Sequence, residues 1–234
     1  MTVAPASPLE VKRLILVPAV VTLAVTVLRV AGELLHGPQT LFNSSEGGAG
    51  AIVGIVWLAP VFGIYFALKL AAGGAGPKTL GRAVGLTLLG VAVMIGLSFL
   101  GSKLIHPNAF EERLLFIGGV FALAAVITLP GWPALFRTLL AYAYAARVPV
   151  AVISFFAFWR GWGTHYDAVP PDVPEGWSWF VKFLWLGLFA QLVFWVAFTV
   201  LAGMLCGSLA LVVARLVQRL RGAKNSLHTG EHAT

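Results

Sequence analysis

The sequence predicts an all-α fold, an integral membrane bundle of about six transmembrane helices. Of 234 residues, 59% are hydrophobic and only 11% are charged, and the mean hydropathy is +0.90. A soluble domain carries about 25% charged residues, so this chain cannot cover a surface that faces water. The apolar residues also gather in runs near the length of about 20 residues that a helix needs to cross the hydrocarbon core. A β-barrel would show short alternating segments instead.

Six apolar stretches give the expected spans. They are residues 14–35, 49–71, 80–101, 109–129, 134–159 and one crossing within 177–220. The fourth ends before Pro130 and Pro133, because proline lacks an N–H and clashes with the preceding turn. The last stretch is too long for one crossing, since residues 180–214 would extend about 50 Å as a helix. We therefore expect its start to lie in the membrane interface, with Lys182 reaching toward headgroups.

The chain is expected to form one domain with a short tail. Residues 1–221 make the single transmembrane domain, and residues 222–234 make a polar cytoplasmic tail that we expect to be disordered. The stretch 30–32 resembles a signal-peptide cleavage site, but the apolar run continues through Leu34 and Leu35. This continuation favours an uncleaved first helix.

Basic residues set the expected orientation, because Lys and Arg are retained on the cytoplasmic side. With both termini inside, ten basic residues flank the cytoplasmic ends, namely Lys12, Arg13, Lys69, Lys78, Arg82, Arg137, Arg215, Arg219, Arg221 and Lys224. Five flank the outer ends, namely Arg29, Lys103, Arg113, Arg160 and Lys182. Richness in alanine, glycine and valine with little lysine favours a bacterial inner membrane. We therefore expect a multi-pass cell-membrane protein.

The net charge of +7 does not indicate nucleic acid, because the basic residues are scattered along the ends of the apolar runs. At the cytoplasmic surface, Arg215, Arg219 and Arg221 are expected to meet anionic lipid headgroups. The alternative is that these residues simply stop the last helix. The single cysteine, Cys206, excludes an intramolecular disulfide and any multi-cysteine metal site.

Arg147 is the most unusual residue of the expected spans, because it lies near the middle of the fifth. An arginine at the bilayer centre costs at least about 2.5 kcal/mol, so it normally faces the bundle and has a partner. Pro149 lies two residues on, and a kink there would expose a backbone carbonyl. With Tyr142, Tyr144 and Gln191, Arg147 forms the candidate ligand-binding site. The alternative is a structural arginine held by carbonyls or by Gln191.

The expected outer loops contribute one histidine each, namely His36, His106 and His165. Together with Asp167 and Glu33 they form a candidate site for a divalent metal, because imidazole and carboxylate are common ligands. They also fit a general acid–base pair or a proton sensor. The alternative is that polar loops simply contain such residues. No catalytic residue is assigned.

Arg29 and Glu33 are four residues apart, which places them on one helix face and predicts a local ion pair near the outer interface. If Glu33 instead reaches an outer histidine, it joins the histidine site.

Three glycine pairs have the spacing that allows helices to approach closely: Gly50 and Gly54, Gly81 and Gly85, Gly203 and Gly207. We expect them to hold the bundle together, and homodimerisation through one pair is the alternative.

Three functions are compatible with these features. The first, which we favour, is non-enzymatic binding of a partner, lipid or small solute within the bundle. The sequence therefore favours a protein that is not an enzyme. The second is an outer-face, metal-dependent enzyme that uses the loop histidines and carboxylates. The third is a small-solute transporter with a proline-kinked fifth helix.

Overall fold

The computed structural model describes residues 8–45, 52–106 and 109–231, and this part of the chain contains helices and no strand. The helices are α1 (Pro8–Leu34), α2 (Leu58–Ala72), α3 (Leu80–Leu104), α4 (Phe110–Thr128), α5 (Pro133–Arg160), the short α6 (Trp179–Lys182), the π-helix η2 (Phe183–Phe194) and α7 (Trp195–Glu231).

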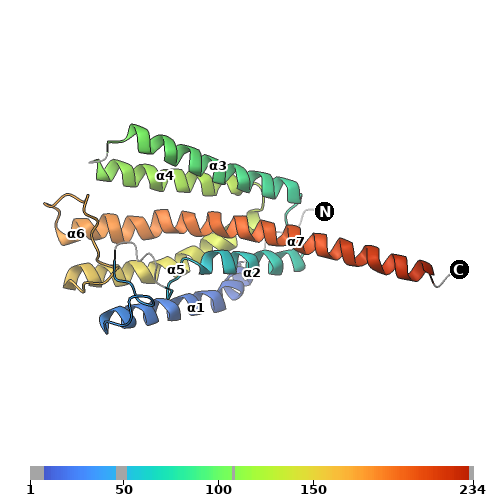
Figure 1. The fold of residues 1–234 in the computed structure, drawn as a ribbon, viewed down its shortest axis with the longest axis horizontal. Coiled ribbons are helices and arrows are strands. Elements are labelled where there is room, and N and C mark those ends of the chain that lie inside the picture. Colours follow the sequence, from blue (N-terminus) through green and yellow to red (C-terminus); the bar gives the residue numbers. More distant parts are fainter. Residues whose placement is uncertain (1–7, 46–51, 107–108, 232–234) are drawn as a thin grey trace.

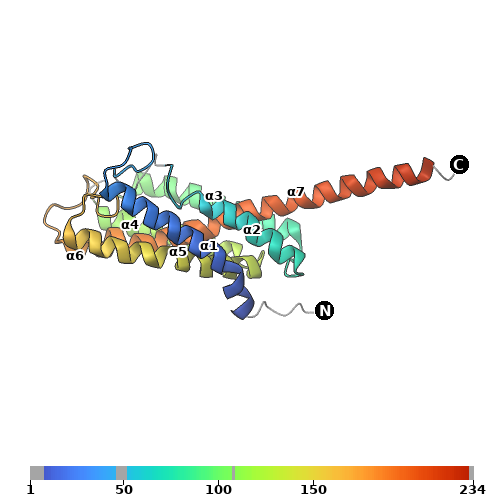
Figure 2. The same cartoon turned by 90° about the horizontal axis from the view of Figure 1, so that it is seen from below.

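The helices form an elongated bundle with α5 and α7 at its centre (Figure 1). The α3–α4 hairpin packs on one side of α7, and α1 packs on the other side of the bundle against α5. We call the end that carries residues 161–178 the loop end, and the end that carries residues 73–79 and 129–132 the tail end. At the tail end α7 projects beyond all the other helices (Figure 2).

The expected helical membrane bundle is confirmed. Within the described part of the chain, four helical segments are long and apolar enough to cross a membrane: Val11–Leu34, Leu80–Leu104, Pro133–Arg160 and Trp179–Arg221. The shorter α2 and α4 complete a bundle of about six helices. The length and apolarity of the runs therefore predicted the helical class of the fold.

The second span differs from the prediction, which placed a helix over residues 49–71. The helix α2 begins only at Leu58, and its 15 residues extend about 22 Å. Residues 52–57 are described and are not helical, whereas residues 49–51 lie outside the described part. Two of their backbone N–H groups bond instead to the loop after α1, Ile52 to Thr40 and Val53 to Leu41, each at 3.2 Å. Hydropathy cannot separate an apolar extended segment from an apolar helix.

The last span agrees with the prediction that no turn divides it, because α6, η2 and α7 follow one another without a break. The tail was expected to be disordered, but α7 continues through Glu231, so residues 222–231 are helical. No proline interrupts this region, so each residue can add one further i→i−4 hydrogen bond to the existing helix. Residues 232–234 lie outside the described part.

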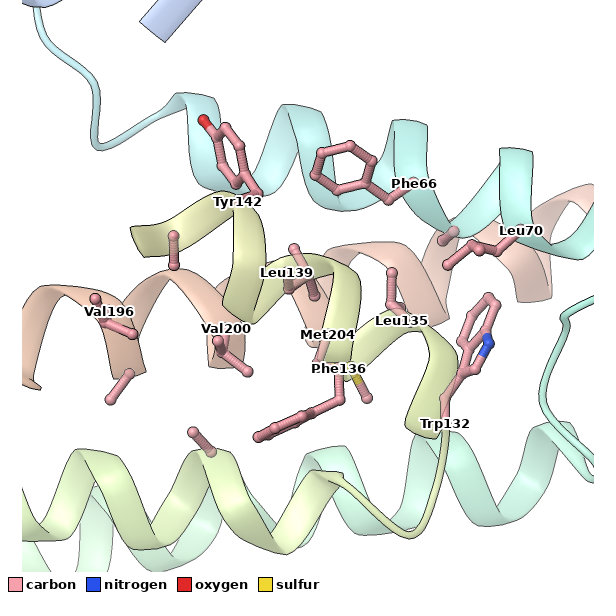
Figure 3. Packing of buried hydrophobic residues seen from close by; sticks show 14 of the residues in the cluster. Phe66, Leu70, Trp132, Leu135, Phe136, Leu139, Tyr142, Val196, Val200 and Met204 are labelled. Atoms are coloured by element: carbon pink, nitrogen blue, oxygen red, sulfur yellow. The ribbon is translucent and has the colours of Figure 1, made fainter. Parts of the chain in front are cut away.

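The core lies between α2, α5 and α7 near the tail end (Figure 3). Trp132, which directly precedes α5, and Leu135, Leu139 and Tyr142 of α5 face α2 and α7, and all four are almost completely buried. The ring of Tyr142 packs edge-on against Phe66 at a centroid distance of 5.4 Å.

One of the three expected glycine pairs holds two helices together. A Cβ on Gly63 of α2 would lie 2.4 Å from Cα of Gly203, and one on Gly207 would lie 2.7 Å from the carbonyl oxygen of Gly63. Only glycine permits this approach of α2 to α7. Gly81 and Gly85 of α3 have no described atom near their Cβ positions, and Gly50 lies outside the described residues.

Candidate ligand-binding site

A cavity of about 210 Å³ opens between α1, α5, η2 and two non-helical segments, residues 52–57 and the 161–178 loop. Its polar wall consists of Thr26, Arg29, Arg147, Ser154, His165, Tyr166 and Gln191. Its apolar wall includes Ile55, Val56, Leu186 and Ala190. Non-helical backbone is tolerated at membrane depth where it is buried in protein or lines a polar cavity, and residues 52–57 fit this rule.

Arg147 lies in the middle of the 28-residue α5 and is only 4% exposed. Its Nη1 donates a long hydrogen bond of 3.4 Å to Oε1 of Gln191. Its guanidinium carbon lies 4.8 Å from the ring centre of Trp195, a cation–π distance. Its Nε has no hydrogen-bond partner among the described residues, and no described carboxylate forms an ion pair with it.

The two tyrosines that were grouped with Arg147 in the expected site do not line the cavity. Tyr142 is 1% exposed within the core, and its hydroxyl shares a 2.8 Å hydrogen bond with that of Thr22 on α1. Tyr144 is 44% exposed on the outside of α5. Two residues span about 200° of helix rotation, so these side chains must point in nearly opposite directions. Of the four expected ligand-binding residues, Arg147 and Gln191 line the cavity and the tyrosines do not.

Gln191 is presented by the π-helix η2, which is 12 residues long. A π-helix closes i→i+5 hydrogen bonds, is rare, and occurs frequently at functional sites. The wider turn changes which residues face α5 compared with an α-helix of the same sequence. Leu186, Ala190 and Gln191 face the cavity, and Trp195 follows directly at the start of α7.

At the loop end Glu33 connects three groups. Its Oε1 accepts from Nε of Arg29 at 2.8 Å, which confirms the expected i,i+4 ion pair. The same oxygen lies 2.5 Å from Nδ1 of His165, and Oε2 accepts from the backbone N–H of His165 at 2.8 Å. The Glu33 side chain is fully buried. Glu33 therefore reaches one loop histidine and attaches the 161–178 loop to α1.

Asp167 organises the loop rather than facing His165 as a partner. Its carboxylate accepts from the backbone N–H groups of Gly163 at 2.9 Å and Thr164 at 2.8 Å, and from the Thr164 hydroxyl at 2.7 Å. A side chain that bonds nearby backbone N–H groups stabilises a tight turn. Gly161, at φ 64°, ends α5 immediately before this turn.

The three loop histidines have different surroundings. His165 lies in the cavity wall, whereas His36 and His106 are exposed. Among the described residues, no group of three His, Cys, Asp or Glu side chains comes together as a metal site. The geometry therefore offers no support for a divalent metal held by His36, His106, His165, Asp167 and Glu33.

Burial shifts two loop groups toward their neutral forms. Burial lowers the pKa of His165, although the hydrogen bond to Glu33 opposes this shift. Burial likewise raises the pKa of Tyr166 well above its ordinary value. The two rings lie against each other with centroids 3.8 Å apart. At neutral pH the cavity wall therefore presents a neutral imidazole and a neutral phenol.

The fold and this cavity define the class, a helical membrane protein with several spans and a polar cavity toward one end. No protein-family model, curated protein or solved structure matches the chain.

Several lining residues were not predicted from the sequence. Trp195 was assigned to an apolar run, Ser154 to a span, and Ile55 and Val56 to a helix. The approach of Trp195, Ile55 and Val56 to Arg147 depends on the π-helix and on the non-helical segment, which no sequence pattern shows. Ser154 follows Arg147 by seven residues on α5, and this spacing on one helix face is the signal that could have found it. Tyr166 lies in the polar 161–178 loop, and no sequence pattern assigns it a role in the site.

Proposed function

We propose that this membrane protein binds a small solute or a lipid headgroup in the cavity beside Arg147. The observation that carries the proposal is the convergence of polar side chains from α1, α5, η2 and the 161–178 loop on one space of about 210 Å³. A chain that spans a membrane gains nothing from polar groups at this depth unless they meet one another or a ligand. Among the described residues, Arg147 has a single hydrogen-bond partner, Gln191, at the long distance of 3.4 Å.

The size of the cavity limits the ligand. A cavity of about 150 Å³ accommodates benzene, and drug-sized pockets start near about 300 Å³. The cavity beside Arg147 lies between these values, which suits a small solute or one headgroup rather than a whole lipid.

A transporter of the same solute is the second candidate. Two segments next to the cavity, residues 52–57 and η2, depart from α-helical geometry. Interrupted helices beside a binding site are typical of secondary transporters. Flux of the bound solute into proteoliposomes would separate transport from binding alone, and a bound solute that does not cross would contradict it.

The binding proposal is tested with the full chain in a mild detergent. Native mass spectrometry would show retained molecules, and thermal unfolding would be followed with anionic, cationic and neutral small solutes. A ligand at about 100 times its Kd stabilises a protein by about 2.7 kcal/mol, which is a rise of several degrees.

Ala190→Phe fills the cavity, and Leu188→Phe places the same phenylalanine side chain on the same π-helix outside the cavity. We expect the stabilising solute to act on the wild type and Leu188→Phe but not on Ala190→Phe. A solute that acts on both variants alike, or the absence of any retained or stabilising molecule, would contradict the proposal.

A further inference from the structure

We propose, on the basis of the binding function above, that the group held beside Arg147 is an oxyanion, a carboxylate or a phosphate. The structure brings together a buried guanidinium without a described carboxylate partner and two hydroxyls without described partners around one cavity.

The charged groups that line the cavity favour an anionic ligand. Arg147 and Arg29 both line the cavity, and Glu33 forms an ion pair with Arg29. No described carboxylate forms an ion pair with Arg147, so the described lining has an excess of positive charge. A buried charge without a partner is strongly unfavourable in a protein interior and more so in a membrane. An anionic ligand would supply the missing charge, whereas a cationic ligand would be repelled.

One edge of the Arg147 guanidinium has no described hydrogen-bond partner. Nη1 donates to Gln191, while Nε has no partner and Nη2 makes no hydrogen bond with a described residue. Nε and Nη2 form one edge of the planar fork, and this edge binds two oxygens of a carboxylate or phosphate at once. The contact of Arg147 with Trp195 holds the guanidinium plane in place.

Two hydroxyl groups in the cavity wall can donate hydrogen bonds to the same ligand. Ser154 and Tyr166 line the cavity and are 2% and 7% exposed, and neither side chain forms a hydrogen bond with a described residue. The charged oxygens of an oxyanion accept hydrogen bonds, so they can satisfy a serine hydroxyl, a tyrosine hydroxyl and the guanidinium edge together. A neutral ligand would satisfy the hydroxyls and leave the charge of Arg147 without a counterion.

The oxyanion has two sources, a free solute and the headgroup of an anionic lipid whose tails stay outside the cavity. The test uses the full chain in neutral detergent for the first source, with sodium phosphate, sodium acetate and uncharged acetamide as probes in isothermal titration calorimetry. For the second source, the chain is placed in nanodiscs that mix phosphatidylglycerol with phosphatidylcholine. Mass spectrometry then counts the anionic lipid that stays with each chain after transfer to detergent.

Arg147→Gln removes the charge, and Arg147→Lys keeps the charge but loses the fork. Arg160→Gln is the matched control, because Arg160 ends the same helix and stacks on Trp159 at 4.2 Å outside the cavity. We expect saturable binding of phosphate or acetate, or retention of one phosphatidylglycerol per chain. This binding should weaken by about 10- to 100-fold in Arg147→Gln, less in Arg147→Lys, and not in Arg160→Gln.

If Arg147→Gln does not fold, Ser154→Ala and Tyr166→Phe test the proposal in its place. Each variant should weaken anion binding by about fivefold. Anion binding that is unchanged in every folded variant overturns the inference. Binding of acetamide or another neutral solute that Ala190→Phe abolishes, without any anion binding, also overturns it and leaves the binding function intact. If neither anions nor neutral solutes bind and no lipid is retained, both proposals are wrong.

Discussion

His165 and Glu33 are 132 positions apart in the sequence, yet Nδ1 of the histidine lies 2.5 Å from Oε1 of the carboxylate. The backbone N–H of His165 donates to the other oxygen of Glu33. The 161–178 loop contributes His165 and Tyr166 to the cavity wall, so one buried carboxylate on α1 positions that wall. The candidate site and the attachment of the loop are therefore coupled.

Glu33→Gln is expected to release the loop from α1. The amide cannot accept the hydrogen bonds of Arg29 and His165 as a carboxylate does, and Arg29 loses its buried counterion. Breaking a buried ion pair costs about 3 to 5 kcal/mol. We expect a lower unfolding temperature and faster hydrogen exchange of residues 161–170.

Glu111→Gln is the control for this variant, because Glu111 is exposed in the first turn of α4. It should unfold and exchange like the wild type. Equal exchange of the loop in Glu33→Gln and Glu111→Gln would mean that Glu33 does not attach the loop.

Loop attachment is expected to weaken in acid. The pKa of His165 is lowered in the folded protein from its ordinary value of 6.5, and burial is the main cause. The stability that this neutral histidine contributes is therefore complete above about pH 6.5 and is lost as the pH falls below that value. Arg29 also disfavours the charged imidazole, while Glu33 and Asp167 favour it and set how far the pH must fall.

Hydrogen exchange of the loop between pH 8 and pH 5, corrected for the intrinsic rate, measures this effect. His165→Asn keeps a donor near the Nδ1 position and removes the titration, so its loop protection should not depend on pH in this range. His36→Asn should behave like the wild type, since His36 is exposed. A wild-type loop whose protection is constant down to pH 5 would refute the role of His165.

Tyr142→Phe is expected to loosen α1 from α5. The substitution removes the hydrogen bond between the Tyr142 and Thr22 hydroxyls and leaves the ring packing in place. Hydrogen bonds between helices in membranes contribute about 0.6 kcal/mol on average and up to about 2 kcal/mol. A double-mutant cycle with Thr22→Val, measured by unfolding in mixed micelles, should show coupling of this size. Strictly additive effects would show that the hydrogen bond contributes nothing.

Gly63→Ala is expected to separate α2 from α7. Its new methyl group would meet the backbone of Gly203 at 2.4 Å, and backbone cannot move aside as a flexible side chain can. Overpacking costs about 1 to 3 kcal/mol or more. Gly81→Ala is the control, since nothing described lies near its Cβ position.

The amount of folded protein after size-exclusion chromatography and the thermal unfolding temperature would report the difference. Gly63→Ala should fail or unfold early, and Gly81→Ala should match the wild type. If Gly81→Ala instead changes the oligomeric state, the alternative of homodimerisation through the Gly81 and Gly85 pair gains support.

The predictions from sequence succeeded where a local pattern decides the outcome. The spacing of Arg29 and Glu33 predicted their ion pair, because residues four apart on a helix are neighbours regardless of the rest of the fold. The run that ends in Pro130 predicted the boundary between α4 and α5 for a similarly local reason. They failed at residues 52–57, where hydropathy is the same for a helix and for an apolar non-helical segment packed on a bundle.

The sequence alone determined that the chain is a bundle of apolar helices, and it singled out Arg147, Gln191 and His165 as unusual polar residues. Apolarity and helix length are properties of each segment, so they can be read before the segments meet. Only the tertiary structure decided that these three residues share a cavity, that Tyr142 and Tyr144 do not, and that Glu33 attaches the loop. Such contacts join residues far apart in the chain, and their geometry depends on how the helices pack and on the π-helical turn of η2.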